Sequence, residues 1–262
     1  MSSAQQPKAR RERPMDERFL QGRHFLKSNW HFVTDIKSDQ SLGLPPPPQE
    51  LPPEADDSLV PLPSVEHLFE GGASLHALLR NRKSRRNFRI SALALEELSY
   101  LLWACEGVRE NKGKFSFRTA PSGGARHPLD LYVFARRVAG IKPGLYRYLP
   151  VEHILVLERE GDDSESLDRA LMGQLQNASC VFFWAAVPYR SEWRYGKAAD
   201  KLVALDAGHS CQNLYLACEA LGFGTCAIGK YEQTELDGYL GLDGEDMFAM
   251  YAAIVGKPAE KE

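Results

Sequence analysis

The stretch DKLVALDAGHSCQNLYLACEALG, residues 200–222, constrains the fold more than any other part of the chain. Its pattern is helical for about 20 residues, it ends at Gly222, and it carries little polar surface. Small residues such as Ala204 and Gly208 are interspersed along it, so that another helix could approach closely. A helix that is apolar nearly all round is expected to be buried. The sequence therefore predicts a central helix in the domain core and at a subunit interface.

Composition bounds the class of protein. The chain has 262 residues, 44% of them hydrophobic, and a net charge of −3, which is enough for a sizeable core and gives no argument for a nucleic-acid or membrane partner. The N-terminus lacks the apolar segment of a signal peptide, and no run of about 18 apolar residues occurs. The five cysteines include no CxxC pair and no zinc-like spacing. We expect free thiols, no metal site and a cytoplasmic protein.

A proline-rich segment divides the chain. Eight of the 16 prolines lie in PPPPQELPPEADDSLVPLP, residues 45–63, which predicts an extended polyproline segment that cannot build sheet ladders. Residues 1–63 are therefore expected to form an N-terminal arm and linker, residues 64–258 the compact domain and residues 259–262 a tail. The arm carries RFLQGRHFLKSNWHF, too apolar for a free tail. We expect it to pack along the domain surface, although a PxxP ligand for another protein is the alternative.

Helix and strand patterns alternate after residue 63, which predicts an α+β domain. The helical patterns, apart from the central one, cover residues 74–82, 93–107 and 166–175. The strand patterns cover residues 130–138, 145–149, 153–158, 180–187, 225–229 and 248–257.

The segment RNRKSRRNF, residues 80–88, is a candidate anion site. Arg82, Ser84 and Arg86 are spaced by two, so in an extended segment their side chains would point the same way. Two guanidinium groups and a hydroxyl on one face suit phosphate oxygens. Arg85 would then point the other way, and its replacement should cost little. A solvated basic loop is the alternative.

Two glycine-containing stretches have two interpretations each. RTAPSGGARHP, residues 118–128, precedes a strand pattern and fits either an ordinary turn or a backbone lying close to a flat or anionic ligand. GFGTCAIGKYE, residues 222–232, fits either a common helix-to-strand connection or the approach of a bulky group. We interpret His209 as a hydrogen-bonded core residue. No GxGxxG or GxSxG motif occurs, and the scarcity of acid–base motifs points to chemistry carried by a cofactor.

Taken in order, these motifs resemble the nitroreductase superfamily over residues 70–258, and within it the branch of SagB-type dehydrogenases and thiazoline oxidases. The quoted stretches that carry the resemblance include RKSRRNF, APSGGARHP, LDAGHSCQNLYLACEALGFGTCAIG and YAAIVGKP. The resemblance implies an α+β nitroreductase-like fold, with a central mixed sheet flanked by helices, in a domain-entwined homodimer. It also implies FMN bound at the dimer interface.

Site residues follow from the resemblance by position. It implies that Arg82, Ser84 and Arg86 hold the FMN phosphate and the polar edge of the ring. It implies that the loop with Ser122 reaches the flavin from the other subunit, with the Ser122 hydroxyl as a donor. The remaining implied cofactor-binding positions are Pro121, Gly123, Gly124 and Ala125 in that loop, Gln174, the turn at Ile228 and Gly229, and Lys257 near the phosphate.

The sequence departs from the family at several positions. Ala125 and His127 replace an Asn and a Gln of the loop, and the Lys-Tyr pair of azoline oxidases is Arg194-Tyr195 here. Arginine cannot exchange protons near neutral pH, which argues against peptide azole formation.

The resemblance implies an FMN-dependent oxidoreductase. NAD(P)H would reduce FMN by hydride transfer to N5, and a nitroaromatic, quinone or unknown acceptor would reoxidise it by ping-pong exchange. One alternative is a SagB-like dehydrogenase that oxidises a peptide azoline or related C–N bond and passes electrons to oxygen. The other is a flavin-binding, non-enzymatic partner in a biosynthetic complex. The NADH or NADPH preference stays open.

Overall fold

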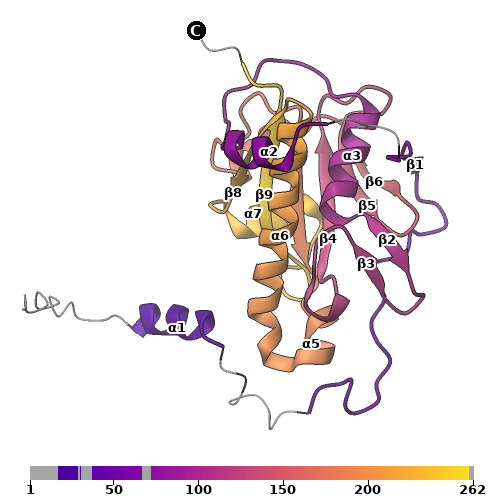
Figure 1. Ribbon diagram of the computed structural model, residues 1–262, viewed down its shortest axis with the longest axis vertical. Coiled ribbons are helices and arrows are strands. Elements are labelled where there is room, and N and C mark those ends of the chain that lie inside the picture. Colours follow the sequence, from indigo (N-terminus) through magenta and orange to yellow (C-terminus); the bar gives the residue numbers. More distant parts are fainter. Residues whose placement is uncertain (1–16, 29, 31–36, 67–71, 260–262) are drawn as a thin grey trace, which may run out of the picture.

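The computed structural model describes residues 17–28, 30, 37–66 and 72–259. Its centre is a seven-stranded sheet in the order β1-β6-β5-β4-β7-β9-β8 (Figure 1). The strands are β1 (Leu59–Pro61), β4 (Leu129–Ala135), β5 (Gly144–Leu149), β6 (Ile154–Glu160), β7 (Cys180–Ala186), β8 (Gly224–Ile228) and β9 (Phe248–Gly256). A separate hairpin pairs β2 (Val108–Asn111) with β3 (Ser116–Arg118). The helices are α1 (Glu17–Leu26), α2 (Leu75–Asn81), α3 (Leu95–Glu106), α4 (Ser164–Ala170), α5 (Tyr189–Tyr195), α6 (Ala199–Ala220) and α7 (Gln233–Leu240).

Helices cover both faces of the sheet. Successive side chains of a strand point to opposite faces, and the two core clusters divide accordingly. Val133 and Phe182 pack with residues of α3 and α6, whereas Phe134 and Phe183 pack with residues of α4 and α7. Both faces of the central strands are therefore apolar, which explains the nearly continuous apolar run of β7. The result is the α+β architecture that the sequence predicts.

The expected mixed sheet is antiparallel at all six pairings of its described strands. Short connections join β4 to β5 and β5 to β6, and such connections allow only antiparallel neighbours. Parallel pairing at the sheet occurs where Ser84 forms a single bridge with Thr225 of β8. A second isolated parallel bridge joins Leu93 and Val138, outside the named strands, so the expectation of a mixed sheet is wrong for the described strands.

Helix α6 runs along most of the molecule, from α5 at the bottom of the view to the level of α2 near the top (Figure 1). Its core face buries Val203, Ala207 and Leu214 as expected. The opposite face is open in a single chain, however, and Leu205 is 48% exposed. His209 lies on this exposed face, so its interpretation as a core histidine is wrong.

The proline-rich segment differs from the expectation at one point. Residues Leu59–Pro61 form β1 and pair with β6 at the edge of the sheet. An edge strand tolerates proline because one side needs no ladder hydrogen bonds. The described arm also packs against the domain, as expected. The Trp193 indole donates to Leu44 O at 3.0 Å and the Gln49 side chain to Gly113 O at 2.8 Å.

None of the helices in the described part of the chain combines the length and apolar character that a membrane crossing requires. All five cysteines are free and buried. Burial raises the pKa of the Cys211 thiol to about 12, so this group is packing material and not a nucleophile.

Candidate functional site

The segment that follows α2 passes over the ends of two strands. Arg85 N donates to Thr225 O of β8, and Arg89 N donates to Lys257 O just beyond β9, both at 3.0 Å. Two glycines permit this close approach. A Cβ on Gly224 would lie 2.8 Å from the Arg85 Cβ, and a Cβ on Gly256 would lie 2.8 Å from the Phe88 ring. The segment is therefore fixed to the sheet by its backbone.

Tyr215 of α6 organises the side chains of this segment. Its hydroxyl shares a 2.9 Å hydrogen bond with the Ser84 hydroxyl and accepts from Ala227 N at 2.9 Å. The Arg82 guanidinium lies over the Tyr215 ring, 5.2 Å from its centre. The structure thus brings Arg82 and Ser84 together, as the spacing predicts. Tyr215 could not be predicted as a partner, because it lies 131 residues from Ser84 along the chain.

Arg82 and Arg86 have no carboxylate partner among the described residues, and Arg86 is exposed. Arg85 differs. Its guanidinium binds Glu219 of α6 through two contacts of 2.5 and 3.3 Å, with both side chains largely buried. The Arg85 side chain is thus occupied by α6, and the expectation that its replacement changes FMN binding little stays a prediction. The ion pair with Glu219 was invisible at the sequence level because 134 residues separate the partners.

The loop at Pro121–His127 forms a tight 3-10 turn at Gly123–Ala125. Gly124, Ala125 and His127 all have left-handed φ angles, of 62°, 53° and 47°. A Cβ on Gly124 would collide with the Tyr195 hydroxyl and approach the Arg194 side chain. The glycine is therefore needed both for its conformation and for close packing against the end of α5.

The Ser122 hydroxyl braces this loop. It donates to Asp206 of α6 at 2.6 Å and accepts from His127 N at 2.9 Å. Gly123 N also donates to Asp206, at 3.3 Å. The expectation that Ser122 donates to a ligand conflicts with this geometry, because a hydroxyl has one proton and Asp206 takes it.

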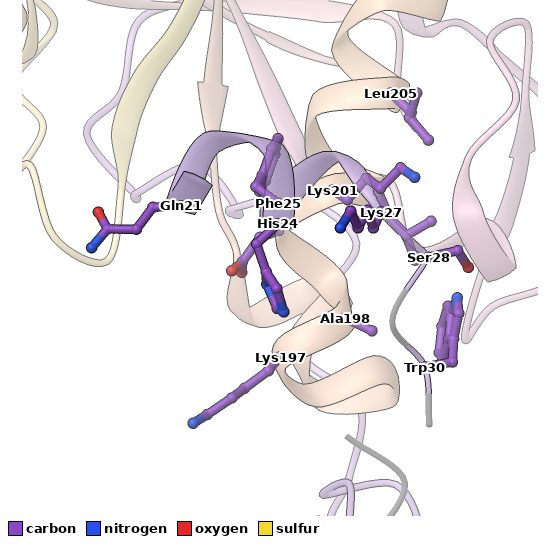
Figure 2. A pocket seen from close by; sticks show the side chains of 12 residues that line it. Gln21, His24, Phe25, Lys27, Ser28, Trp30, Lys197, Ala198, Lys201 and Leu205 are labelled. Atoms are coloured by element: carbon purple, nitrogen blue, oxygen red, sulfur yellow. The ribbon is translucent and has the colours of Figure 1, made fainter. Parts of the chain in front are cut away.

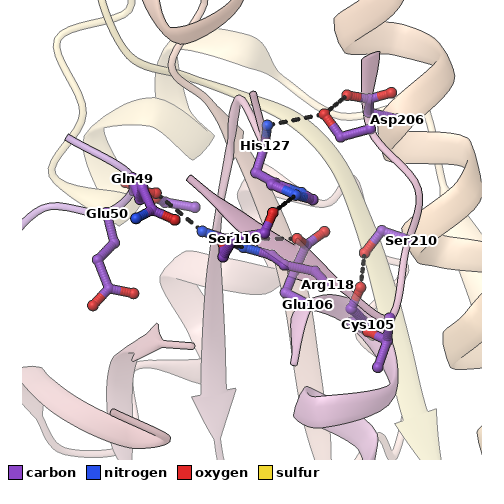
Figure 3. Close-up of polar contacts among 12 residues, drawn as sticks. Gln49, Glu50, Cys105, Glu106, Ser116, Arg118, His127, Asp206 and Ser210 are labelled. Atoms are coloured by element: carbon purple, nitrogen blue, oxygen red, sulfur yellow. Dashed lines mark hydrogen bonds and ion pairs between the residues drawn. The ribbon is translucent and has the colours of Figure 1, made fainter. Parts of the chain in front are cut away.

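A buried polar network supports the loop from below (Figure 3). The His127 ring bonds Ser116 O at 3.0 Å, and Arg118 pairs with Glu106 at 3.3 Å. Burial raises the pKa of Glu106, with Arg118 opposing, and burial together with the charge of Arg118 lowers the pKa of His127 to about 3. His127 is therefore neutral and structural near pH 7.

The Ile228–Gly229 turn lies next to Gln174. The Gln174 amide donates to Lys230 O at 2.7 Å and to Leu171 O at 2.8 Å. Its two protons thus hold the turn, which leaves only its oxygen for a ligand. Ile228 is buried, whereas Gly229 is exposed. The structure brings Gln174 to the turn, as the resemblance implies.

Lys257 lies at the other end of β9. Its ammonium group is 5.2 Å from the centre of the Phe223 ring, and its carbonyl accepts from Arg89 N. The residue therefore adjoins the anion segment through its backbone, while its charge rests on an aromatic face.

The two halves of the predicted site do not meet within one chain. Ser84 contacts α6 at Tyr215, whereas Ser122 contacts it at Asp206. Nine helical positions at 1.5 Å each separate the contacts by roughly 13 Å. Figure 1 shows the same separation, with α2 near one end of α6 and α5 at the other.

A cavity of about 520 Å³ lies between α1 and the start of α6 (Figure 2). Lys201 donates to Leu26 O at 2.7 Å, and the Trp30 ring meets Tyr195 edge to face at 5.7 Å. The arm thus reaches the pair Arg194-Tyr195 that packs on Gly124.

A family model described as "Nitroreductase family" matches residues 79–257, which is more than half of the chain. The chain belongs to the nitroreductase family. The match contains every predicted cofactor-binding position, from Arg82 to Lys257. It also contains the buried network and both contacts of α6 described above.

Relatives of this nitroreductase-family chain include "Putative nitroreductase MJ1384" of Methanocaldococcus jannaschii, 34% identical over 69% of this chain and 88% of the relative. "Trifolitoxin-processing protein TfxB" of Rhizobium leguminosarum bv. trifolii is 29% identical over 55% of this chain and 40% of that protein.

Solved structures of the same fold include the "putative nitroreductase" of Ralstonia eutropha JMP134. It has a TM-score of 0.65 and 30% identity, and the match covers 82% of this chain and 98% of that one. The E. coli microcin synthetase McbBCD complex contains a chain with a TM-score of 0.59 and 17% identity, covering 92% and 98% of the two chains. At that identity the second likeness concerns the fold alone.

Proposed function

We propose that this chain is an FMN-dependent oxidoreductase that works as a homodimer. The observation that carries the proposal is the pair Arg82 and Arg86, which flank Ser84 and have no carboxylate partner among the described residues. Two uncompensated guanidinium groups beside a hydroxyl suit a phosphate monoester. Arg85, in the same segment, is neutralised by Glu219, so it offers no open charge to a ligand.

The residues present fit a flavin at a second point. The loop at Gly123–Ala125 offers backbone and small side chains, and a flat group could lie against it without steric conflict. When bound, FMN would supply two-electron and one-electron redox chemistry. The chain would bind the phosphate with Arg82, Ser84 and Arg86, present Gly229 at the ring, and position the loop through Asp206. Lys257 is the outermost proposed phosphate contact.

The dimer is supported by the separation of these half-sites along α6. A partner helix packed on the open face of α6, at Leu205 and Gly208, could bring the loop of one subunit to the anion segment of the other. Light scattering at micromolar concentration tests this, and we expect a dimer that persists at high salt because apolar contacts are little screened. Leu205→Glu should give monomers.

NAD(P)H is the proposed electron donor, and the acceptor would be reduced at the same site in a second half-reaction. Anaerobic stopped-flow mixing with NADH and NADPH tests the first half. We expect rapid bleaching of flavin absorbance with at least one of them. An absence of bleaching with both would exclude this reaction and favour the alternatives.

A second function is favoured by two observations. The relative that processes trifolitoxin is 29% identical over 150 residues, and Arg194-Tyr195 packs directly on Gly124 of the proposed flavin loop. This chain would then oxidise a peptide azoline or related C–N bond. Incubation with a model thiazoline peptide and mass spectrometry, which detects the loss of two hydrogens, tests it. A product lighter by two hydrogens would support this function, and its absence would agree with the arginine that replaces lysine, because a guanidinium stays charged.

Flavin binding itself is tested by fluorescence titration of FMN into apoprotein. Hydrogen bonds to a charged group contribute about 1.5–3 kcal/mol, so Arg82→Gln and Arg86→Gln should each raise the dissociation constant roughly ten- to a hundredfold. Lys83 is exposed and lies between them, so Lys83→Gln removes the same charge and should change affinity little. Equal effects of all three substitutions would contradict direct phosphate contact.

A further inference from the structure

A second cavity, of about 760 Å³, lies beside the loop at Ser122–Ala125. Its other walls come from the β2–β3 hairpin, from α5 and from the arm near Gln40 and Pro46. The arm is fixed on both sides, because Gln40 N donates to Trp193 O at 2.8 Å and Arg118 donates to Gln49 O at 3.0 Å. A cavity of this size suits a small molecule and not a folded macromolecule.

The lining is strongly cationic. Arg109, Lys114, Arg118, Arg126 and Arg194 all line the cavity, and no Asp or Glu is among the described lining residues. The chain as a whole has more acidic than basic residues, 35 against 32. Of these five cations, Arg118 alone has a carboxylate partner among the described residues, and that partner is Glu106. The cavity therefore concentrates uncompensated positive charge.

Arg126 is the most informative of these residues because it is buried, with 8% of its surface exposed. Its Nε donates to Arg190 O at 2.8 Å, and its guanidinium lies 4.7 Å from the centre of the Trp193 ring. The carboxylate of Asp130, four residues further along the chain, is occupied by Arg190 at 2.6 and 3.1 Å. No carboxylate among the described residues is left for Arg126.

A buried cation without a counter-ion is costly. Burial and the nearby charge of Arg194 lower the pKa of Arg126, yet a guanidinium stays protonated at neutral pH. The terminal nitrogens of Arg126 make no hydrogen bond with the described residues, and Arg126 lines the cavity together with Arg194. An anionic group placed there would relieve the repulsion between them.

The cavity also offers flat apolar surface. Phe115 and Phe117 of the hairpin meet edge to face at 5.5 Å and remain 38% and 40% exposed. Both line the cavity. Exposed aromatic rings beside unpaired arginines suit a ligand that is planar and apolar at one end and charged at the other.

We propose that this cavity selects the redox substrate of the enzyme and takes molecules with a flat apolar body that bears a carboxylate or similar anionic group. Arg126 and Arg194 contact the anion, and Phe115 and Phe117 contact the planar body. The proposal rests on the proposed function, because the cavity is a substrate site only if the loop at Ser122–Ala125 faces the flavin.

Isothermal titration of the oxidised protein, without electron donor, tests selectivity separately from turnover. The probes are 4-nitrobenzoate and its neutral analogue 4-nitrobenzamide. We expect the anion to bind about tenfold more tightly, with the difference decreasing as salt is added. Arg126→Gln should abolish the preference, and Arg194→Gln and Lys114→Gln should each reduce it severalfold.

Lys112→Gln is the matched control. Lys112 lies on the same hairpin as Lys114, but it pairs with Glu110 and does not line the cavity, so the preference should be unchanged. If Arg126→Gln does not fold, the anion preferences of Arg194→Gln and Lys114→Gln, at two exposed positions, test the proposal.

Equal affinity for the two probes would overturn the proposal. So would an intact preference in Arg194→Gln and Lys114→Gln, or a loss of bound flavin in these variants, which would assign the cations to the cofactor. Weakened NADP⁺ binding with unchanged 4-nitrobenzoate binding would also overturn it, because the cavity would then serve the nucleotide. An anion preference in a protein that binds no flavin would leave the anion cavity standing and refute the proposed function instead.

Discussion

Ser122→Ala separates two roles that the loop hydroxyl could have. If Ser122 were a donor to the flavin, the substitution would weaken FMN binding and leave the apoprotein as stable as before. The structure indicates a brace instead, because Ser122 donates to Asp206 and accepts from His127 N. The effect should therefore be present before any ligand is added.

The magnitude follows from the two hydrogen bonds that are lost. A bond to a carboxylate contributes about 1.5–3 kcal/mol and a neutral one about 0.5–1.5 kcal/mol. The buried Asp206 carboxylate and the His127 N–H would both lose a partner, so we expect the free energy of unfolding to fall by about 2–4 kcal/mol. For a chain of this size that lowers Tm by about 5–15 °C.

The assay is urea denaturation of flavin-free protein, followed by tryptophan fluorescence. Asp206→Asn and the double variant complete a double-mutant cycle, and a coupling energy above about 0.5 kcal/mol is expected for residues in contact. An unchanged unfolding midpoint in apo Ser122→Ala, together with weaker FMN binding, would refute the brace and restore the role that the resemblance implies.

Three further predictions follow from contacts described above. Arg85→Gln should lower the free energy of unfolding by about 1–3 kcal/mol. Adding Glu219→Gln to this variant should lower it little further, since both substitutions remove one largely buried ion pair. Additive losses in urea titrations would argue against the pair. Gly124→Ala should lower Tm more than Gly173→Ala. Both glycines have positive φ, but of the two only the Gly124 position would place a Cβ against another side chain. Equal decreases in Tm would leave φ strain as the whole cause. As pH falls from about 6.5 toward 3, the free energy of unfolding of the wild type should fall by up to about 1.4 kcal/mol per pH unit relative to His127→Gln. The reason is that the lowered pKa of buried His127 stabilises the folded state above the unfolded pKa, and this contribution is lost in acid. Parallel pH profiles of the denaturation midpoints would show that His127 is already charged in the folded state.

Local patterns predicted much of the fold. The apolar periodicity located α3, α6 and the strands from β4 to β9 to within a few residues. Helices α1, α5 and α7, strand β1 and the β2–β3 hairpin were missed. These elements are short or polar, and tertiary packing stabilises them more than their own sequence does.

The site divides in the same way. Spacing by two correctly placed Arg82 and Ser84 together, because an extended segment is a local property. Tyr215, Asp206 and Glu219 were not predictable, because each meets its partner across more than 80 residues. The brace at Ser122 was missed for that reason: the residue type permits donation to a ligand, but only the fold reveals that Asp206 accepts its proton.

The two strands β6 and β8 are each bordered by a short segment from the same part of the chain. β1 covers β6, and Ser84 and Arg85 cover β8. Five strand spacings of about 4.8 Å place β6 and β8 roughly 24 Å apart, yet the two covers lie within 30 residues of each other in sequence.

An uncovered edge presents unpaired backbone groups that can recruit another chain. During synthesis both covering segments emerge before the strands that they cover, so the completed sheet never lacks its covering segments. A proteolytic cut before Leu59 should leave both strand edges covered. A cut within residues 62–74 would release β1 and expose the unpaired backbone groups of β6. Aggregation of the chain after limited proteolysis is therefore expected to depend on where the cut falls, and not on how much is removed.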